Sequence, residues 1–210
     1  MSSRVFVQDG QTIPVPFIND LIQDIILAED RVEATMSPTA SRDFVRAAFA
    51  LNEGLLDWFR GLVSKWLVGR MLRYDELQIA KLYMIGTVTH RLSKQGKLET
   101  EAARRSFIND LAFVIRTGAE CWHLDPTKFF SDVGWDQTQK ALKVRHRVTH
   151  PKRKDDLYIS TEELELVRES MRWVLWSTGV IIRYADNADM DYIDSKNGVV
   201  KSDLHDILSP

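Results

Sequence analysis

The spacing of apolar residues restricts the fold of this chain more than any other feature of the sequence. Apolar residues recur every three or four positions along most of the chain, for example at Phe44, Ala47, Ala48, Leu51 and Leu55. This interval places them on one face of an α-helix. The 210 residues include 10 glycines and 6 prolines, so the helical stretches are long. The sequence therefore predicts an all-α fold, an up-and-down helical bundle with additional helices.

Breaks in this pattern divide the chain into an arm, a helical domain and a tail. Residues 1–16 hold two prolines near their end and are predicted to form an extended N-terminal arm. Residues 17–186 are predicted to form one helical domain, and residues 187–210 an acidic tail of low order or a docking arm. Ser41 and Ser160 are predicted N-caps, and Ser160 has the spacing of a capping box. The predicted helices are Phe17–Ala34, Ser41 to about Arg70, Asp75–Ser93, Thr100–Trp122, Trp135–Val148 and Ser160 to about Asp186.

Composition and motifs exclude several classes of protein. Cys121 is the single cysteine, so no intrachain disulfide forms, and we expect it to be a buried structural thiol. The longest apolar run, Trp173–Ile182, is roughly half of a membrane span, and the first residues have no run of signal-peptide length. We therefore expect a soluble cytoplasmic protein without membrane contact. The motifs of nucleotide-binding loops and of serine hydrolases are absent from the sequence.

The segment 140-KALKVRHRVTHPKRKDD-156 has an unusual charge for this chain. Seven basic residues fall within 140–154 without an acidic residue, whereas the whole chain has a net charge of −2. The remaining residues therefore carry −9 together. The same segment holds His146 and His150, two of the five histidines. We call residues 140–154 the basic segment.

Proline determines where the helix that carries the basic segment ends. Pro151 disfavours the helical conformation of His150, so the chain is expected to leave the helix there. In a regular helix His146 and His150 share a face, whereas Arg145 and His150 lie roughly 140° apart. An irregular conformation at His150 allows its imidazole to turn away from the helix end while Arg145 stays one turn before it.

These residue types can cleave RNA without a metal ion. Histidine can give or take a proton at neutral pH, and the arginine fork matches the non-bridging oxygens of a phosphate. RNA supplies its own nucleophile, the 2′-hydroxyl, so acid–base help and charge stabilisation suffice. We therefore expect no cofactor and no metal. Further cations of the segment are candidates for binding RNA phosphates: Lys143, Arg147, Lys152, Arg153 and Lys154.

The sequence from Arg145 to His150 resembles the R-x4-H motif of HEPN domains, in the form with a polar residue directly after the arginine. HEPN domains are all-α bundles whose motif lies in a late helix, followed by a loop and a final long helix. The resemblance covers about residues 41–185 and implies a metal-independent endoribonuclease that acts as a homodimer on RNA. It implies Arg145 and His150 as the catalytic pair, with His146 as accessory residue. Such proteins often serve as toxins or in antiviral defence, so an antitoxin or regulatory protein is a further expected partner.

HEPN members often carry a polar or acidic residue on an early helix that points at the motif. Asn52 and Glu53 are the candidates in this chain. Glu53 is also unusual from its surroundings alone, because it is an acid within an apolar helix stretch. Alternatively, Glu53 is a half-exposed residue at the flank of its helix without a role in a site.

Other interpretations of the basic segment remain open. Its cations can simply be a solvated helix end that complements the helix dipole. A metal site on His146 and His150 lacks support, because Arg147 stands where the H-E-x-x-H motif has glutamate. A non-catalytic module could bind nucleic acid or protein through the same cations. In a scaffold protein, the aspartates of the tail could dock on Lys152–Lys154 of the same chain or of a neighbour.

Overall fold

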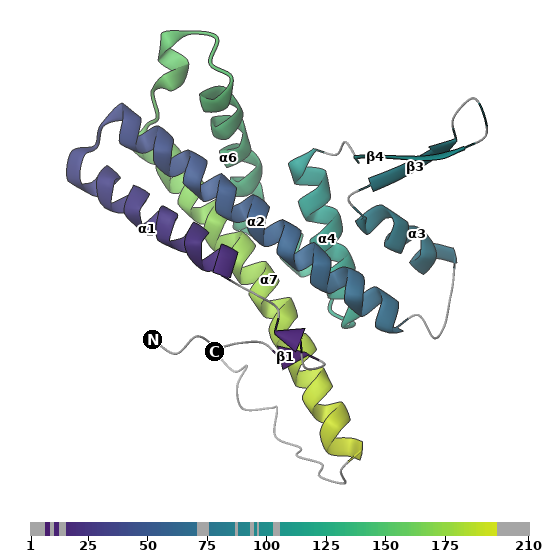
Figure 1. Ribbon diagram of the computed structural model, residues 1–210. Coiled ribbons are helices and arrows are strands. Elements are labelled where there is room, and N and C mark those ends of the chain that lie inside the picture. Colours follow the sequence, from purple (N-terminus) through teal and green to yellow (C-terminus); the bar gives the residue numbers. More distant parts are fainter. Residues whose placement is uncertain are drawn as a thin grey trace.

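The computed structural model describes residues 7–8, 11–12, 16–70, 76–86, 88–92, 95, 97–102 and 106–196. In this part of the chain seven α-helices pack against one another, so the predicted all-α bundle is confirmed (Figure 1). None of the described helices is long and apolar enough to cross a lipid bilayer. The helices are α1 (Pro16–Thr35), α2 (Pro38–Arg70), α3 (Glu76–Ile85), α4 (Phe107–Cys121), α5 (Thr127–Phe130), α6 (Val133–Thr149) and α7 (Thr161–Lys196), and a short 3-10 helix, η1 (Lys154–Leu157), lies between α6 and α7.

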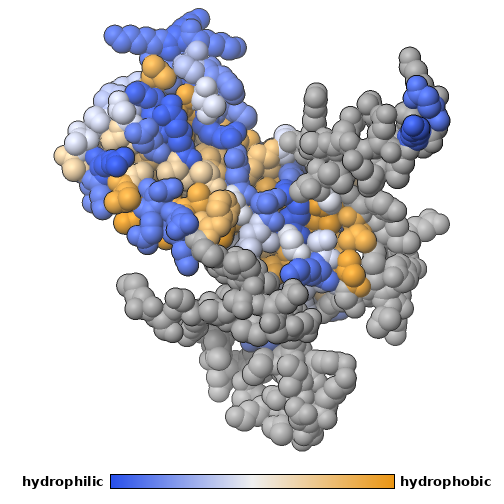
Figure 2. Space-filling model, in the orientation of Figure 1, coloured by the Kyte–Doolittle hydropathy of each residue, from blue (hydrophilic) through white to orange (hydrophobic). Residues whose placement is uncertain are grey.

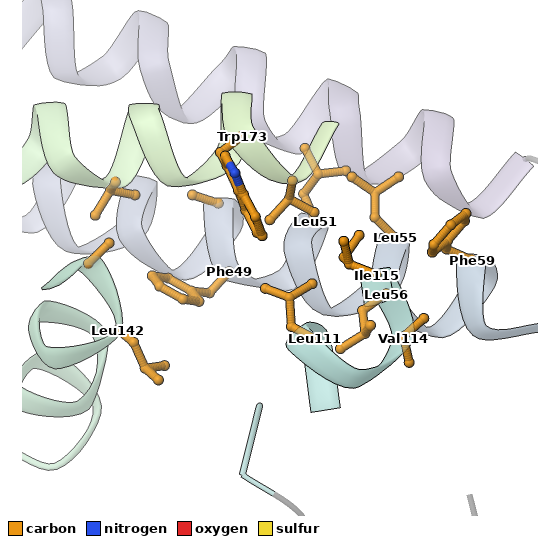
Figure 3. Close-up of a cluster of buried hydrophobic side chains, with 14 of the residues drawn as sticks. Phe49, Leu51, Leu55, Leu56, Phe59, Leu111, Val114, Ile115, Leu142 and Trp173 are labelled. Carbon is orange, nitrogen blue, oxygen red and sulfur yellow. The ribbon is translucent and has the colours of Figure 1, made fainter. Parts of the chain in front are cut away.

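Helix α2 lies at the centre of the bundle. It packs against α1, α4 and α7 (Figure 1). Helix α6 packs mainly against α7. The apolar faces of α2, α4, α6 and α7 meet in one continuous core (Figure 3). Among its most deeply buried side chains are Phe44, Phe49 and Phe59 of α2 and Ile115 of α4. Cys121 is buried, as predicted.

Helix ends follow local sequence signals, not always the predicted ones. Ser37, not Ser41, caps α2: the Ser37 hydroxyl accepts the N–H of Ala40 at 3.2 Å, and Pro38 occupies the first helical position. Ser41 lies inside the helix and is buried. The predicted capping box at Ser160 is confirmed. Its hydroxyl accepts the N–H of Glu163 at 3.3 Å, and its own N–H donates to the Glu163 carboxylate at 3.1 Å.

The predicted third and fourth helices are wrong where they approach each other. Helix α3 ends at Ile85 and α4 begins at Phe107, and between them strands β3 (Val88–Leu92) and β4 (Leu98–Ala102) pair antiparallel. His90 stands opposite Thr100 in this register. The first strand begins with Val88 and Thr89, whose β-branched side chains favour strands, and Gly96 lies between the two strands in the sequence.

Of the two ends of the chain, the C-terminal one differs from the prediction. Within the arm, β1 (Val7–Gln8) and β2 (Gln11–Thr12) pair antiparallel, and its other residues before Pro16 lie outside the described part. At the other end α7 continues to Lys196, so residues 187–196 are helical and not a tail of low order. Residues 197–210 lie outside the described part.

The length of α7 separates residues 186–196 from the basic segment. The backbone at Asp186 is 25 residues beyond the start of α7 at Thr161, which corresponds to roughly 38 Å of helix. Lys152–Lys154 precede that start, at the opposite end of α7 (Figure 1). Docking of residues 186–194 on Lys152–Lys154 of the same chain is therefore wrong.

Candidate functional site

Helix α6 ends where the sequence predicts. Asp132 caps its beginning by accepting the N–H of Gly134 at 2.7 Å. At its end His150 has φ −127° and ψ 61°, outside the helical region, while its N–H still donates to the carbonyl of His146 at 3.0 Å. The side chains of His146 and His150 are both exposed. His150 is thus fixed through its backbone and presents its imidazole to solvent.

Arg145 forms the contact that joins the basic segment to α2. Its Nη2 donates to Oε1 of Glu53 at 2.5 Å, and its guanidinium lies over the ring of Phe49, with Cζ 5.7 Å from the ring centroid. Phe49 and Glu53 are four residues apart, so they share one face of α2. The ring and the carboxylate hold the guanidinium from two sides. The Arg145 side chain is 28% exposed, so it remains accessible to a ligand.

Asn52, the other predicted accessory residue, does not reach this site. It is fully buried, and its Nδ2 donates to the hydroxyl of Ser170 on α7 at 3.4 Å. Its Oδ1 has no hydrogen-bond partner within the described part of the chain. Asn52 therefore belongs to the interface of α2 with α7, whereas the next residue, Glu53, belongs to the site.

Arg147 is occupied by contacts with the start of α7. Its two terminal nitrogens donate to the two carboxylate oxygens of Glu163 at 2.8 and 2.7 Å, and Nη2 also donates to the carbonyl of Tyr158 at 3.0 Å. The hydrogen bond to Glu163 raises the pKa of Arg147. Burial acts to raise the pKa of Glu163, but hydrogen bonds from Arg147 and the N–H of Ser160 outweigh it and lower this pKa. Arg147 joins α6 to α7, and we leave it out of the phosphate-binding set.

The connection between α6 and α7 is folded around Asp156. Its Oδ2 accepts the N–H groups of Lys152 at 2.7 Å and Arg153 at 2.9 Å, and these two hydrogen bonds lower the pKa of Asp156. From α2, Nη1 of Arg42 donates to the carbonyl of Leu157 at 3.3 Å. The backbone of the connection is therefore tied to itself and to α2.

The remaining cations of the basic segment differ in their surroundings. Lys140 forms a salt bridge with Asp136 at 2.5 Å. Lys143, Lys152, Arg153 and Lys154 are exposed and form no salt bridge with any residue that the structure describes. Hydrophilic side chains cover the end of the molecule where α6 joins α7 (Figure 2). These four cations are available to a ligand with phosphate groups.

The structure brings only some of the predicted residues together. Arg145 and Glu53 are in contact, His146 lies in the last turn of the helix that carries Arg145, and His150 caps the end of that helix. Phe49 and Asp156 also belong to this region, and no motif in the sequence indicated them. Only the helical spacing of Phe49 from Glu53 could have suggested its place beside the arginine.

No group of three or more His, Cys, Asp or Glu side chains is arranged to hold a metal ion within the ranges that the structure describes. Comparison of the chain with protein-family models, with curated proteins and with solved structures found no match.

Proposed function

We propose that this protein is a metal-independent endoribonuclease of the HEPN type. The contact between Glu53 and Arg145 is the observation that carries the proposal. It joins the arginine of the R-x4-H motif to an acidic residue of an early helix, and His150 follows at the exposed end of the same helix. A phosphate-binding group and a proton-transferring group thus lie within two helical turns of each other.

The reaction follows from the chemistry of RNA. Arg145 binds the non-bridging oxygens of the scissile phosphate and stabilises the charge that develops on them. A base removes the proton of the 2′-hydroxyl, O2′ bonds to phosphorus, and the bond from phosphorus to O5′ breaks. An acid protonates the leaving O5′. The products are a 2′,3′-cyclic phosphate and a 5′-hydroxyl.

His150 is the residue we assign to proton transfer, as base or acid, and His146 assists it. By the resemblance to HEPN domains, the opposing group comes from a second copy in a homodimer. An antitoxin or another regulatory protein would hold such a nuclease inactive in a cytoplasm rich in RNA, consistent with a role as a toxin or in defence.

A second candidate function is RNA binding without cleavage. It is favoured by the contrast between Arg145, which is paired with Glu53, and the cations of the α6–α7 connection, which are exposed. These cations would suffice to bind phosphates. Such a module would tolerate the loss of His150.

Cleavage of a labelled RNA in EDTA tests the proposal. The wild type is compared with His150→Ala and Arg145→Ala, and the matched controls are Arg46→Ala and His123→Asn. Arg46 is an exposed arginine of α2, and His123 is an exposed histidine with positive φ, which asparagine tolerates. We expect a cyclic-phosphate product, a loss of about 100- to 10,000-fold in the two site variants, and full activity in both controls. RNA binding without cleavage, equal in wild type and His150→Ala, would establish the second candidate instead.

A further inference from the structure

Tyr158 presents its ring to solvent beside the candidate site. Tyr158 is 66% exposed, whereas the next residue, Ile159, is buried in the core. Tyr158 follows η1 directly and has an extended backbone conformation, φ −86° and ψ 135°. The chain therefore directs Ile159 inward and leaves the aromatic ring of Tyr158 outside.

The backbone of Tyr158 is held on both sides. Its N–H donates to the carbonyl of Asp155 at 3.0 Å, and its carbonyl accepts from Nη2 of Arg147 at 3.0 Å. Arg147 stands in the last turn of α6, one turn before His150. The ring of Tyr158 is thus carried on a fixed backbone at the same end of α6 as His150. A fixed platform loses less conformational freedom when it binds a ligand than a flexible one does.

Exposed cations precede this ring in the same connection between α6 and α7. Lys152, Arg153 and Lys154 precede it in the same connection, and no salt bridge to the described part of the chain occupies them. Two acidic residues follow them in the sequence: Asp155 is exposed, and Asp156 accepts the N–H groups of Lys152 and Arg153. Oδ2 of Asp156 thus bonds to backbone N–H groups and not to the side chains of these cations. The connection therefore carries an exposed aromatic ring and three consecutive exposed cations.

Single-stranded nucleic acid is the ligand that fits this combination. Bases stack on aromatic side chains while cations contact the phosphates, and every base has a face that can stack. A duplex hides these faces between base pairs and presents mainly phosphates and 2′-hydroxyls. The proposed attack of O2′ on phosphorus in line with O5′ also requires a nucleotide that is free to leave the regular stack.

We infer that Tyr158 is a base-stacking residue and that the substrate is RNA with unpaired nucleotides at the site of cleavage. The inference that the stacked base lies next to the scissile phosphate rests on the proposed function. The inference that a single strand binds at the α6–α7 connection is independent of the proposed function.

Binding of an RNA that cannot be cleaved tests this inference. The probe is a short fluorescent 2′-O-methyl RNA strand, alone and paired with its complement, measured by fluorescence anisotropy at one fixed salt concentration. The variants are Tyr158→Ala and Tyr158→Phe, which keeps the ring. Tyr184→Ala removes an exposed tyrosine of α7 as the matched control. Circular dichroism and thermal unfolding establish that each variant is folded.

We expect Tyr158→Ala to weaken binding of the single strand by about 5- to 100-fold. Tyr158→Phe, Tyr184→Ala and all measurements with the duplex should stay near the wild-type values. Equal losses in Tyr158→Ala and Tyr158→Phe, wild-type affinity in Tyr158→Ala, or equal binding of duplex and single strand would each overturn the inference.

Cleavage of the unmodified strand by the wild type separates the two proposals. Binding that depends on Tyr158 without any cleavage would refute the ribonuclease and retain the stacking residue. Cleavage together with binding that is independent of Tyr158 would retain the ribonuclease and refute the stacking residue.

Discussion

Glu53 and Arg145 are 92 residues apart in the sequence and form an ion pair of 2.5 Å between α2 and α6. The pair is partly exposed, so its contribution to folding stability is small. Its effect on the guanidinium is more important. With Phe49 beneath and Glu53 beside it, Arg145 is oriented before a ligand arrives. Orientation of a charged group in advance of the reaction lowers the barrier that catalysis has to overcome.

The first prediction concerns this orientation. Glu53→Gln removes the charge that holds Arg145, and we expect the rate of RNA cleavage to fall about 10- to 100-fold. Binding of a 2′-O-methyl strand should not weaken, because the variant removes a negative charge from a surface that receives phosphates. Asp57→Asn is the control. Asp57 lies one turn after Glu53 on α2 and pairs with Arg60, not with Arg145. A Glu53→Gln protein that cleaves at the wild-type rate would contradict an orienting role.

The second prediction concerns the exposed cations of the α6–α7 connection. Lys152→Gln should reduce the slope of the logarithm of RNA affinity against the logarithm of salt concentration by about 0.7. The loss should be similar for RNAs of different sequence, because a phosphate contact carries no sequence information. Lys65→Gln, at an exposed lysine of α2, is the control and should leave the slope unchanged. Equal slopes for wild type and Lys152→Gln would mean that RNA does not contact this lysine.

Local sequence signals predicted much of the framework of the site. Pro151 indicated the helix end at His150, and the serine and glutamate of the capping box indicated the start of α7. The capping-box pattern showed only that Glu163 bonds to its own helix end. Its second set of hydrogen bonds, to Arg147, depends on how α6 packs against α7, and nothing local to either residue indicates it. From the sequence alone Arg147 is one more cation of the basic segment, and it was therefore grouped with the candidates for binding phosphate.

Long-range packing also explains the other differences. Asn52 and Glu53 were equivalent candidates in the sequence, and only the positions of α7 and α6 decide which one is buried and which one meets Arg145. The hairpin β3–β4 escaped prediction because its apolar residues also fit a helical interval. The run of β-branched residues Thr87, Val88 and Thr89 and the later Gly96 were the competing signal, and strand pairing prevailed over the helical interval.

The third prediction concerns Glu163 and acid. The pKa of Glu163 is lowered in the folded protein, so its ion pair contributes stability above the ordinary value of 4.5. This contribution is lost as the pH falls through the lower pKa of the folded state. Glu163→Gln should therefore lower the free energy of unfolding by about 1–3 kcal/mol near neutral pH, and its difference from the wild type should shrink in acid.

Urea unfolding near pH 7 and near pH 3 measures this difference. Glu33→Gln, at an exposed glutamate of α1, is the control for loss of a carboxylate as such. A difference between wild type and Glu163→Gln that stays constant from neutral to acidic pH would show that the charge of Glu163 is not responsible.

The fourth prediction concerns the packing that sets the direction of α6. At Gly134, in the first turn of α6, an added Cβ would lie 2.6 Å from Cδ1 and 2.8 Å from Cβ of Trp173. Trp173 cannot move aside easily, because it is buried and its indole N–H donates to the carbonyl of Phe129 at 3.1 Å. Gly134→Ala should lower the free energy of unfolding by about 1–3 kcal/mol. Gly179→Ala provides the matched control in α7, where nothing lies within 4 Å of an added Cβ, and it should raise stability by about 0.5–1 kcal/mol. If both alanine variants are stabilised, α6 does not approach Trp173 this closely. The direction of α6, and with it the positions of Arg145 and His150, would then differ from those described.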